Sequence, residues 1–232
     1  MLLTRVGFGD LQHLAPILLA LIFFIGLIKF SKNKSIEFKK SINLVLSLFV
    51  ALILIVFHLK NALFFNYNIQ VDLPLYLCSL MGLLIPIYTY YRRFWMFEIL
   101  VFWIIVGTLQ GVITPDIEVG FPSFDYFRYW VVHLGLLVII GYEIIVFKLK
   151  PKWQSVVKSF LAFQVYVILI LGLNKILNSN YGYLSAKPKS ASMLDLLGDW
   201  PYYIFKADAI LLIAFSVVFL IFKFSETKLF SK

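Results

Sequence analysis

The sequence predicts an all-α fold: a polytopic membrane protein whose residues 1–232 form a single seven-transmembrane-helix bundle. Three observations lead to this prediction. The chain is 62% hydrophobic, only 14% of its residues are charged, and its mean hydropathy is +0.92. Soluble domains are about 45–50% apolar and about 25% charged. The composition therefore favours a protein that folds in a lipid bilayer.

Seven stretches are long and apolar enough to cross a bilayer as helices, which takes about 20 mainly apolar residues. The first stretch lacks a basic n-region and a small-residue cleavage site, so we expect a retained helix and not a cleaved signal peptide. The loop 178–200 is the longest connection, and its "SMLDLLGDW" segment predicts a short interfacial helix or turn ended by Gly198. The expected spans are approximately 11–30, 41–59, 71–91, 94–114, 126–147, 155–177 and 201–223.

The basic residues predict the orientation of the bundle. The first, third and fifth connections and the C-terminus hold 14 of the 21 Lys and Arg residues, and the opposite side holds seven. Because Lys and Arg concentrate on cytoplasmic loops, we expect the N-terminus outside, the C-terminus in the cytoplasm and a multi-pass protein of the cell membrane. The same clustering accounts for the net charge of +9, so nucleic acid is not an expected partner.

Uncommon polar side chains gather near the predicted outer ends of the spans. Cys78 is the only cysteine, which excludes an intramolecular disulfide, and it shares one membrane level with His13, His58 and His133. Cys78 and His133 each lie about seven residues into their spans, roughly 10 Å down. Polar groups inside a bilayer usually face the bundle interior or a water-filled cavity and often mark function.

Packing alone explains several of these residues. A lone cysteine in an apolar helix is more often buried and inert than reactive, and His13 and His58 at span ends suit interfacial or capping roles. Asp208 could pair with Lys206 or orient a histidine. Asp125, Tyr129 and His133 recur at i, i+4 and i+8, and Gly107 and Gly111 form a small-xxx-small pair. Both patterns indicate helix packing.

Five segments carry a resemblance to a known family: "LPLYLC" (73–78), "GTLQGVITPD" (107–116), "GFPSFDYFRYWVVHLG" (120–135), "NSNYGYL" (178–184) and "KPKSASMLDLLGDWPYYI" (187–204). In this order, and together with the N-terminal "GFGDLQHL", they resemble the YwaF-like bacterial integral membrane proteins. These are related to the eukaryotic transmembrane-protein-164-type phospholipid acyltransferases. Tyr76 stands where the family pattern usually has a histidine.

The resemblance implies a membrane-embedded lipid acyltransferase or acyl hydrolase that uses a cysteine and a histidine, at positions matched here by Cys78 and His133. The expected partners are membrane phospholipids or lysophospholipids, and no metal or other cofactor is expected. The expected supporting pocket comprises Tyr76, His58, His13, Gln110, Asp116, Asn174, Asn180, Tyr181 and Asp208.

Two alternatives remain open from the sequence. A zinc-dependent lipid hydrolase could use His13, His58 and His133, with Asp208, as metal ligands. A non-enzymatic lipid-binding or transport protein could use the same polar level only to hold a lipid headgroup.

Overall fold

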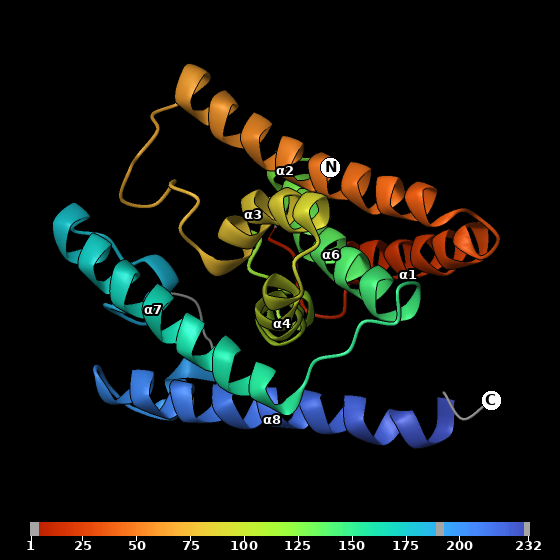
Figure 1. Ribbon diagram of the computed structural model, residues 1–232. Coiled ribbons are helices and arrows are strands. Elements are labelled where there is room, and N and C mark those ends of the chain that lie inside the picture. The colour runs from red at the N-terminus through yellow and green to blue at the C-terminus, as the bar shows by residue number, and fades with distance from the viewer. Residues whose placement is uncertain (1–4, 189–192, 230–232) are drawn as a thin grey trace.

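The computed structural model describes residues 5–188 and 193–229, and all the regular elements in these ranges are helical (Figure 1). This confirms the predicted all-α class. Six of the helical stretches are long and apolar enough to cross a membrane. The elements are α1 (Leu11–Ser31), α2 (Ile36–Phe64), α3 (Leu77–Tyr91), α4 (Phe94–Phe102), the π-helical segment η1 (Trp103–Thr108), α5 (Leu109–Ile113), α6 (Phe124–Ile145), α7 (Trp153–Leu177), the 3-10 turns η2 (Tyr181–Tyr183) and η3 (Met193–Leu197), and α8 (Tyr202–Leu229).

The third predicted span differs from the structure. It was expected at residues 71–91, but α3 begins only at Leu77 and has 15 residues, a length of about 22 Å. Residues 65–76 form no helix, and other side chains serve their main chain: Leu73 N–H donates to the Tyr181 hydroxyl (2.9 Å), and the Tyr166 hydroxyl donates to the Leu75 carbonyl (2.8 Å). Non-helical backbone is tolerated at membrane depth where protein groups satisfy it in this way.

Side chains and backbone conformations set the helix ends. Asp10, Ser35 and Ser123 each accept a main-chain N–H bond in the first turn of α1, α2 and α6, respectively, which satisfies one of the donors that a helix start leaves unpaired. Arg92 and Asn178 take the left-handed conformation that commonly ends a helix, after α3 and α7.

Helix α6 forms the centre of the bundle. It packs against α1, α2, α3, η1 and α5, while α4 packs against α7, and α7 against α8. Helices α7 and α8 therefore form a layer beside α4, on the side away from α2 (Figure 1). The fully buried side chains Leu54, Ile85, Phe97, Phe102 and Ile139 belong to one continuous core.

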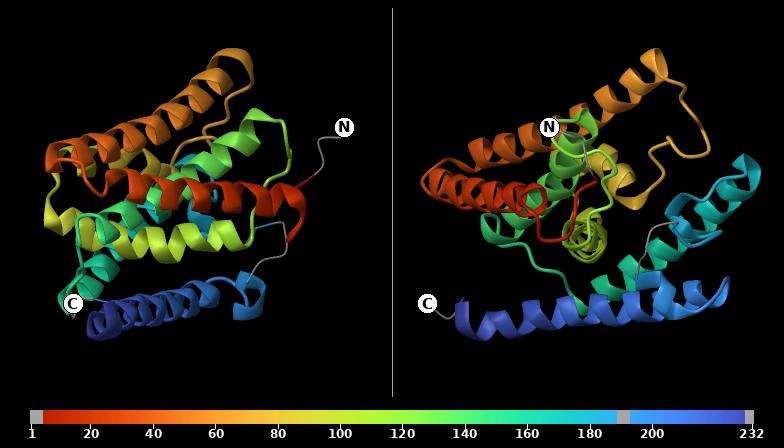
Figure 2. Two further views of the ribbon diagram at one scale, coloured as in Figure 1. Left: turned by 90° about the vertical axis from the view of Figure 1, so that its right-hand side faces the viewer. Right: turned by 180° about the vertical axis from the view of Figure 1, so that it is seen from behind.

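The helices run between two ends of the bundle (Figure 2). We call the site end the one where α1, α3 and α6 begin, and the far end the one where they finish. At the far end, fully buried Glu143 accepts two bonds from the Arg92 guanidinium (2.8 and 2.6 Å) and one from the Asn43 amide (2.7 Å). This cluster joins α2, α3 and α6 through charge-assisted hydrogen bonds.

Candidate functional site

Cys78 is the second residue of α3 and lies at the site end. Its Sγ atom is 3.9 Å from Oγ1 of Thr108, which is fully buried. Thr108 is the last residue of η1, the π-helical segment inside the long α4–η1–α5 helix. Such segments are rare and frequently occur at functional sites. The thiol therefore contacts an irregular turn of a neighbouring helix.

His133 is buried in α6, and one hydrogen bond defines its protonation. Its Nδ1 atom lies 2.8 Å from the Tyr129 carbonyl oxygen. Because a carbonyl can only accept, Nδ1 carries the ring proton, which leaves the lone pair of the neutral imidazole on Nε2. The Tyr129 ring stacks on the imidazole, with centroids 4.0 Å apart and planes 20° apart.

The Cδ2–Nε2 edge of the imidazole faces Gly111. A Cβ atom at Gly111 would lie 2.7 Å from Cδ2 and 2.8 Å from Nε2 of His133, closer than such atoms can approach. Thr108 and Gly111 are three residues apart, so they share one face of the helix within a single turn. Cys78 and His133, which are 55 positions apart in the sequence, thus both contact this turn.

The close approach at Gly111 gives a testable prediction. Gly111→Ala should displace the His133 ring and lower stability by about 1–3 kcal/mol, as overpacking does. Thermal unfolding of the purified protein would measure it. Gly26→Ala is the matched control, because a Cβ at Gly26 meets nothing within 4 Å and alanine is a better helix former than glycine. Equal melting temperatures for the two variants would contradict the close approach.

His13 has a structural role. Its Nδ1 atom accepts a bond from the Gly9 N–H (2.8 Å), and its Nε2 atom donates to the Val112 carbonyl (2.9 Å). The ring also stacks on Trp130, with centroids 5.9 Å apart. Both nitrogens therefore hold the N-terminal segment against the end of α5.

His58 belongs to a separate cluster at the end of α2. Its Nδ1 atom is 3.3 Å from the Tyr67 hydroxyl, which donates to the Asp72 carbonyl (2.9 Å). Burial, reinforced by the Asp72 carboxylate, raises the pKa of Tyr67, so this phenol stays protonated at neutral pH. His58 thus connects α2 to the non-helical segment before α3.

Tyr76 precedes α3 and packs under the 178–200 loop. Its ring centroid is 5.3 Å from that of Tyr181 and 5.8 Å from that of Tyr183. Burial, with smaller contributions from Tyr76 and Asp116, raises the pKa of Tyr183 to about 12. This neutral aromatic cluster covers the start of α3, two residues before the thiol.

Asn174 and Asn180 shape the loop that carries these tyrosines. Asn174 accepts from the Tyr181 N–H (2.8 Å) and donates to the Tyr181 carbonyl (2.9 Å). The Asn180 side chain accepts from the N–H groups of Ser185 (3.0 Å) and Ala186 (2.9 Å). The two asparagines therefore support the site indirectly by fixing the loop.

The side chains of three other predicted pocket residues form bonds that do not involve the imidazole, although the main-chain N–H of Asp116 donates to the Tyr129 hydroxyl (3.4 Å). Gln110 is exposed and donates to Thr114 (2.9 Å), Asp116 forms an ion pair with Arg5, and Asp208 accepts from Gln164 (3.4 Å). None of them is the partner of His133 Nδ1, which is the Tyr129 carbonyl. In the part of the chain that the structure describes, no three His, Cys, Asp or Glu side chains gather as metal ligands, so the three histidines do not form the zinc site of the alternative hydrolase interpretation.

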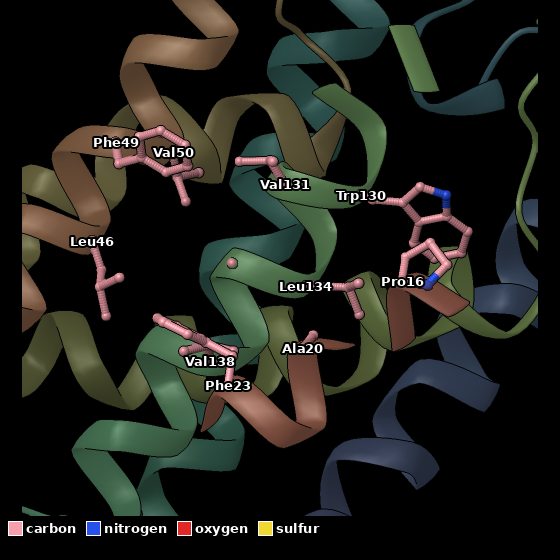
Figure 3. A pocket seen from close by; sticks show the side chains of 11 residues that line it. Pro16, Ala20, Phe23, Leu46, Phe49, Val50, Trp130, Val131, Leu134 and Val138 are labelled. Atoms are coloured by element: carbon pink, nitrogen blue, oxygen red, sulfur yellow. The ribbon is translucent and has the colours of Figure 1, made fainter. Parts of the chain in front are cut away.

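An apolar cavity of about 270 Å³ lies between α1, α2 and α6 (Figure 3). From α6 it is lined by residues 130, 131, 134, 135 and 138. At about 100° per residue these positions are centred about 130° around the helix from His133. The lining contains none of Cys78, Thr108, Gly111 and His133. The cavity is therefore separate from the turn that Cys78 and His133 contact.

Sequence reasoning overlooked Tyr129, Thr108 and Gly111 as parts of the site. Two sequence patterns include Tyr129 and Gly111: Tyr129 precedes His133 by one helical turn, and Gly111 forms a small-xxx-small pair with Gly107. Both patterns were interpreted as helix packing. In the structure, Tyr129 and Gly111 pack the helices together and also contact the His133 ring.

Comparison with known proteins shows the family. The model of the TMEM164 family matches residues 7–219, which include the whole candidate site. Searches of curated proteins and of solved structures found no match. The family match covers nearly the entire chain, and six helices have the length and composition of membrane spans. The chain therefore belongs to the TMEM164 family and is a multi-pass membrane protein.

Proposed function

We propose that the protein is a membrane-embedded lipid acyltransferase or acyl hydrolase in which Cys78 is the nucleophile and His133 the general base. The main support is that both side chains contact one turn of the α4–η1–α5 helix, at Thr108 and Gly111. The lone pair on Nε2 and the thiol are the two groups that nucleophilic catalysis by cysteine requires.

The reaction has two steps. His133 Nε2 takes the Cys78 proton, and the thiolate attacks the carbonyl carbon of a phospholipid ester. The ester C–O bond breaks, the glycerol oxygen takes the proton from His133, and a lysophospholipid leaves. An acceptor hydroxyl then attacks the thioester carbon and gives its proton to His133, which returns it to the Cys78 sulfur. A lysophospholipid acceptor gives acyl transfer, and water gives hydrolysis.

The start of α3 offers donors for the negative charge that develops on the carbonyl oxygen. The N-cap residue Tyr76 forms no side-chain hydrogen bond to the first turn of α3. The main-chain N–H groups of that turn are therefore not capped by a side chain at this position. Cys78 is in this turn. Backbone N–H groups at a helix start are typical stabilisers of an oxyanion.

The proposed setting is the outer leaflet of the cell membrane, with seven passes, the N-terminus outside and the C-terminus in the cytoplasm. Helix α3 is the seventh pass. It is shorter than the other six, and the non-helical residues 65–76 complete the crossing to the outer surface of the membrane. The basic residues support this orientation, because their excess lies at the far end. The site end then meets phospholipid esters near the outer headgroup boundary.

The test is covalent. Purified protein incubated with phospholipid vesicles should gain the mass of one acyl chain, and hydroxylamine should remove it. Cys78→Ala should gain none; because Cys78 is the only cysteine, no other thiol can carry the adduct. Ser79→Ala is a neighbouring control that should retain the adduct. Adding a lysophospholipid then separates acyl transfer from hydrolysis.

A wild-type protein that binds phospholipid without ever gaining the acyl mass would contradict the proposal. That result would favour the non-enzymatic lipid-binding or transport alternative. An adduct on Cys78→Ala would place the nucleophile elsewhere.

A further inference from the structure

We propose that Tyr129 is the positioning residue of His133: it sets the tautomer of the imidazole through its main chain and holds the ring plane through its side chain. The expected effect of Tyr129 on the rate of acyl-adduct formation rests on the proposed function. The tautomer and the orientation of the His133 ring do not depend on it. Nothing in the family match assigns a role to Tyr129.

Three contacts from this one residue define the arrangement. The Tyr129 carbonyl accepts the Nδ1 proton of His133 (2.8 Å), its ring stacks on the imidazole at 4.0 Å, and its hydroxyl donates to the Gly111 carbonyl (2.7 Å). Gly111 is also the residue that faces the far edge of the imidazole. The His133 ring is therefore enclosed between Tyr129 and the turn that contacts Cys78.

The sequence explains why the Gly111 carbonyl accepts this hydroxyl. In a continuing helix, its donor would be the main-chain N–H four residues later. That residue is Pro115, which has no N–H. The Tyr129 hydroxyl supplies the missing donor, so it anchors the tyrosine ring and the end of α5 to each other.

The anchored ring matters because the carbonyl alone restrains only one atom of the imidazole. A histidine held only through Nδ1 can still rotate its ring plane, since this torsion is broad for histidine. The stacked Tyr129 ring removes that freedom and keeps Nε2 directed at the Gly111 side. A displacement of about 1 Å in a reacting group can lower a rate by about 100-fold.

His13 provides an internal reference, because its bonds require the opposite tautomer. Its Nδ1 atom accepts from Gly9 and its Nε2 atom donates to Val112, so the proton lies on Nε2. The chain contains only three histidines. Imidazole ¹⁵N spectra of histidine-labelled protein in nanodiscs can therefore resolve each ring, with His13→Gln and His58→Gln variants for assignment.

The experiment compares Tyr129→Leu and Tyr129→Phe with the wild type. We expect His133 in the wild type to show the Nδ1–H tautomer and His13 the Nε2–H tautomer. Tyr129→Leu keeps the main-chain carbonyl but loses the stacked ring and the hydroxyl, so the imidazole can turn out of reach of that carbonyl. We therefore expect a mixture of tautomers at His133 and a maximal rate of acyl-adduct formation lower by about 10- to 100-fold. The lipid concentration for half-maximal rate should change little. Tyr129→Phe, which keeps the ring, should retain the Nδ1–H tautomer and lose less rate.

Tyr142→Phe is the matched structural control. Tyr142 is fully buried in the same helix, and its hydroxyl donates to Ser31 (2.7 Å) at the far end. This variant loses a comparable hydrogen bond, so it should lower stability without changing the His133 spectrum. An unchanged tautomer and rate in Tyr129→Leu would overturn the proposal, as would equal spectral changes in Tyr142→Phe. Equal losses in Tyr129→Phe and Tyr129→Leu would contradict the role of the ring.

The spectra also separate this inference from the proposed function. A wild type without an acyl adduct would contradict the proposed function, and the tautomer of His133 in the two Tyr129 variants would still decide whether Tyr129 positions the ring. If Tyr129→Leu fails to fold, the rates decide it: Tyr129→Phe, which loses the bond to the Gly111 carbonyl, should form the adduct more slowly than Tyr142→Phe, and equal rates would overturn the proposal.

Discussion

His133→Asn is expected to slow acyl-adduct formation by about 10²–10⁴-fold, the usual contribution of a general base. Asparagine keeps an amide N–H that can donate to the Tyr129 carbonyl in place of Nδ1, but it has no counterpart of the basic Nε2 atom. The variant should therefore fold and lose only the base. The measurement is the rate of mass gain with phospholipid vesicles, beside the melting temperature.

His58→Asn is the control for this prediction. His58 contacts Tyr67 and not the turn between Thr108 and Gly111, so its replacement should leave the adduct rate within about twofold of the wild type, since only groups that contact the reacting atoms act as general bases. A wild-type rate in His133→Asn would exclude His133 as the base. A large loss in His58→Asn alone would assign that role to His58.

Arg92→Ala is expected to lower the melting temperature by on the order of 10 °C. The substitution leaves the Glu143 carboxylate buried without its cationic partner, and breaking a buried ion pair from one side typically costs about 3–5 kcal/mol. The loss falls on the junction of α2, α3 and α6. Thermal unfolding in detergent or nanodiscs would measure it.

Lys158→Ala is the comparison for the buried ion pair. Lys158 pairs with buried Glu98 (2.7 Å), but its side chain is 54% exposed, and Glu98 also accepts from Ser155 (2.7 Å). Water and Ser155 can replace part of the lost interaction, so the melting temperature should fall much less than in Arg92→Ala. A fall of equal size would mean that burial of the cation does not set the stability of these pairs.

The fold could be predicted from sequence because a bilayer leaves few options for the backbone. Long apolar stretches have to satisfy their own main-chain groups, which they do as helices. Six predicted spans correspond to helices of spanning length. The start of α3 could not be predicted in this way, because tyrosines at positions 166 and 181 supply the hydrogen bonds that residues 69–75 would otherwise make within a helix.

The candidate site was predictable in part. The family resemblance implies Cys78 and His133, and the sequence leaves Asp208 as a residue that could orient a histidine. The structure shows a main-chain carbonyl in that role. No side-chain pattern reveals which carbonyl a ring nitrogen will reach, because that depends on the rotamer that the neighbouring helix permits.

By itself, the sequence determined the helical membrane fold, the family motifs and the residue types available for chemistry, because composition and local periodicity are properties of the chain alone. Only the tertiary structure decided that Cys78 and His133 contact one turn, that His13 and His58 bond to other segments, and that Tyr129 encloses the imidazole. These contacts join residues far apart in the sequence. They depend on how the helices pack. Gly111 allows the imidazole to approach closely, and Pro115, which has no N–H, leaves the Gly111 carbonyl available to the Tyr129 hydroxyl.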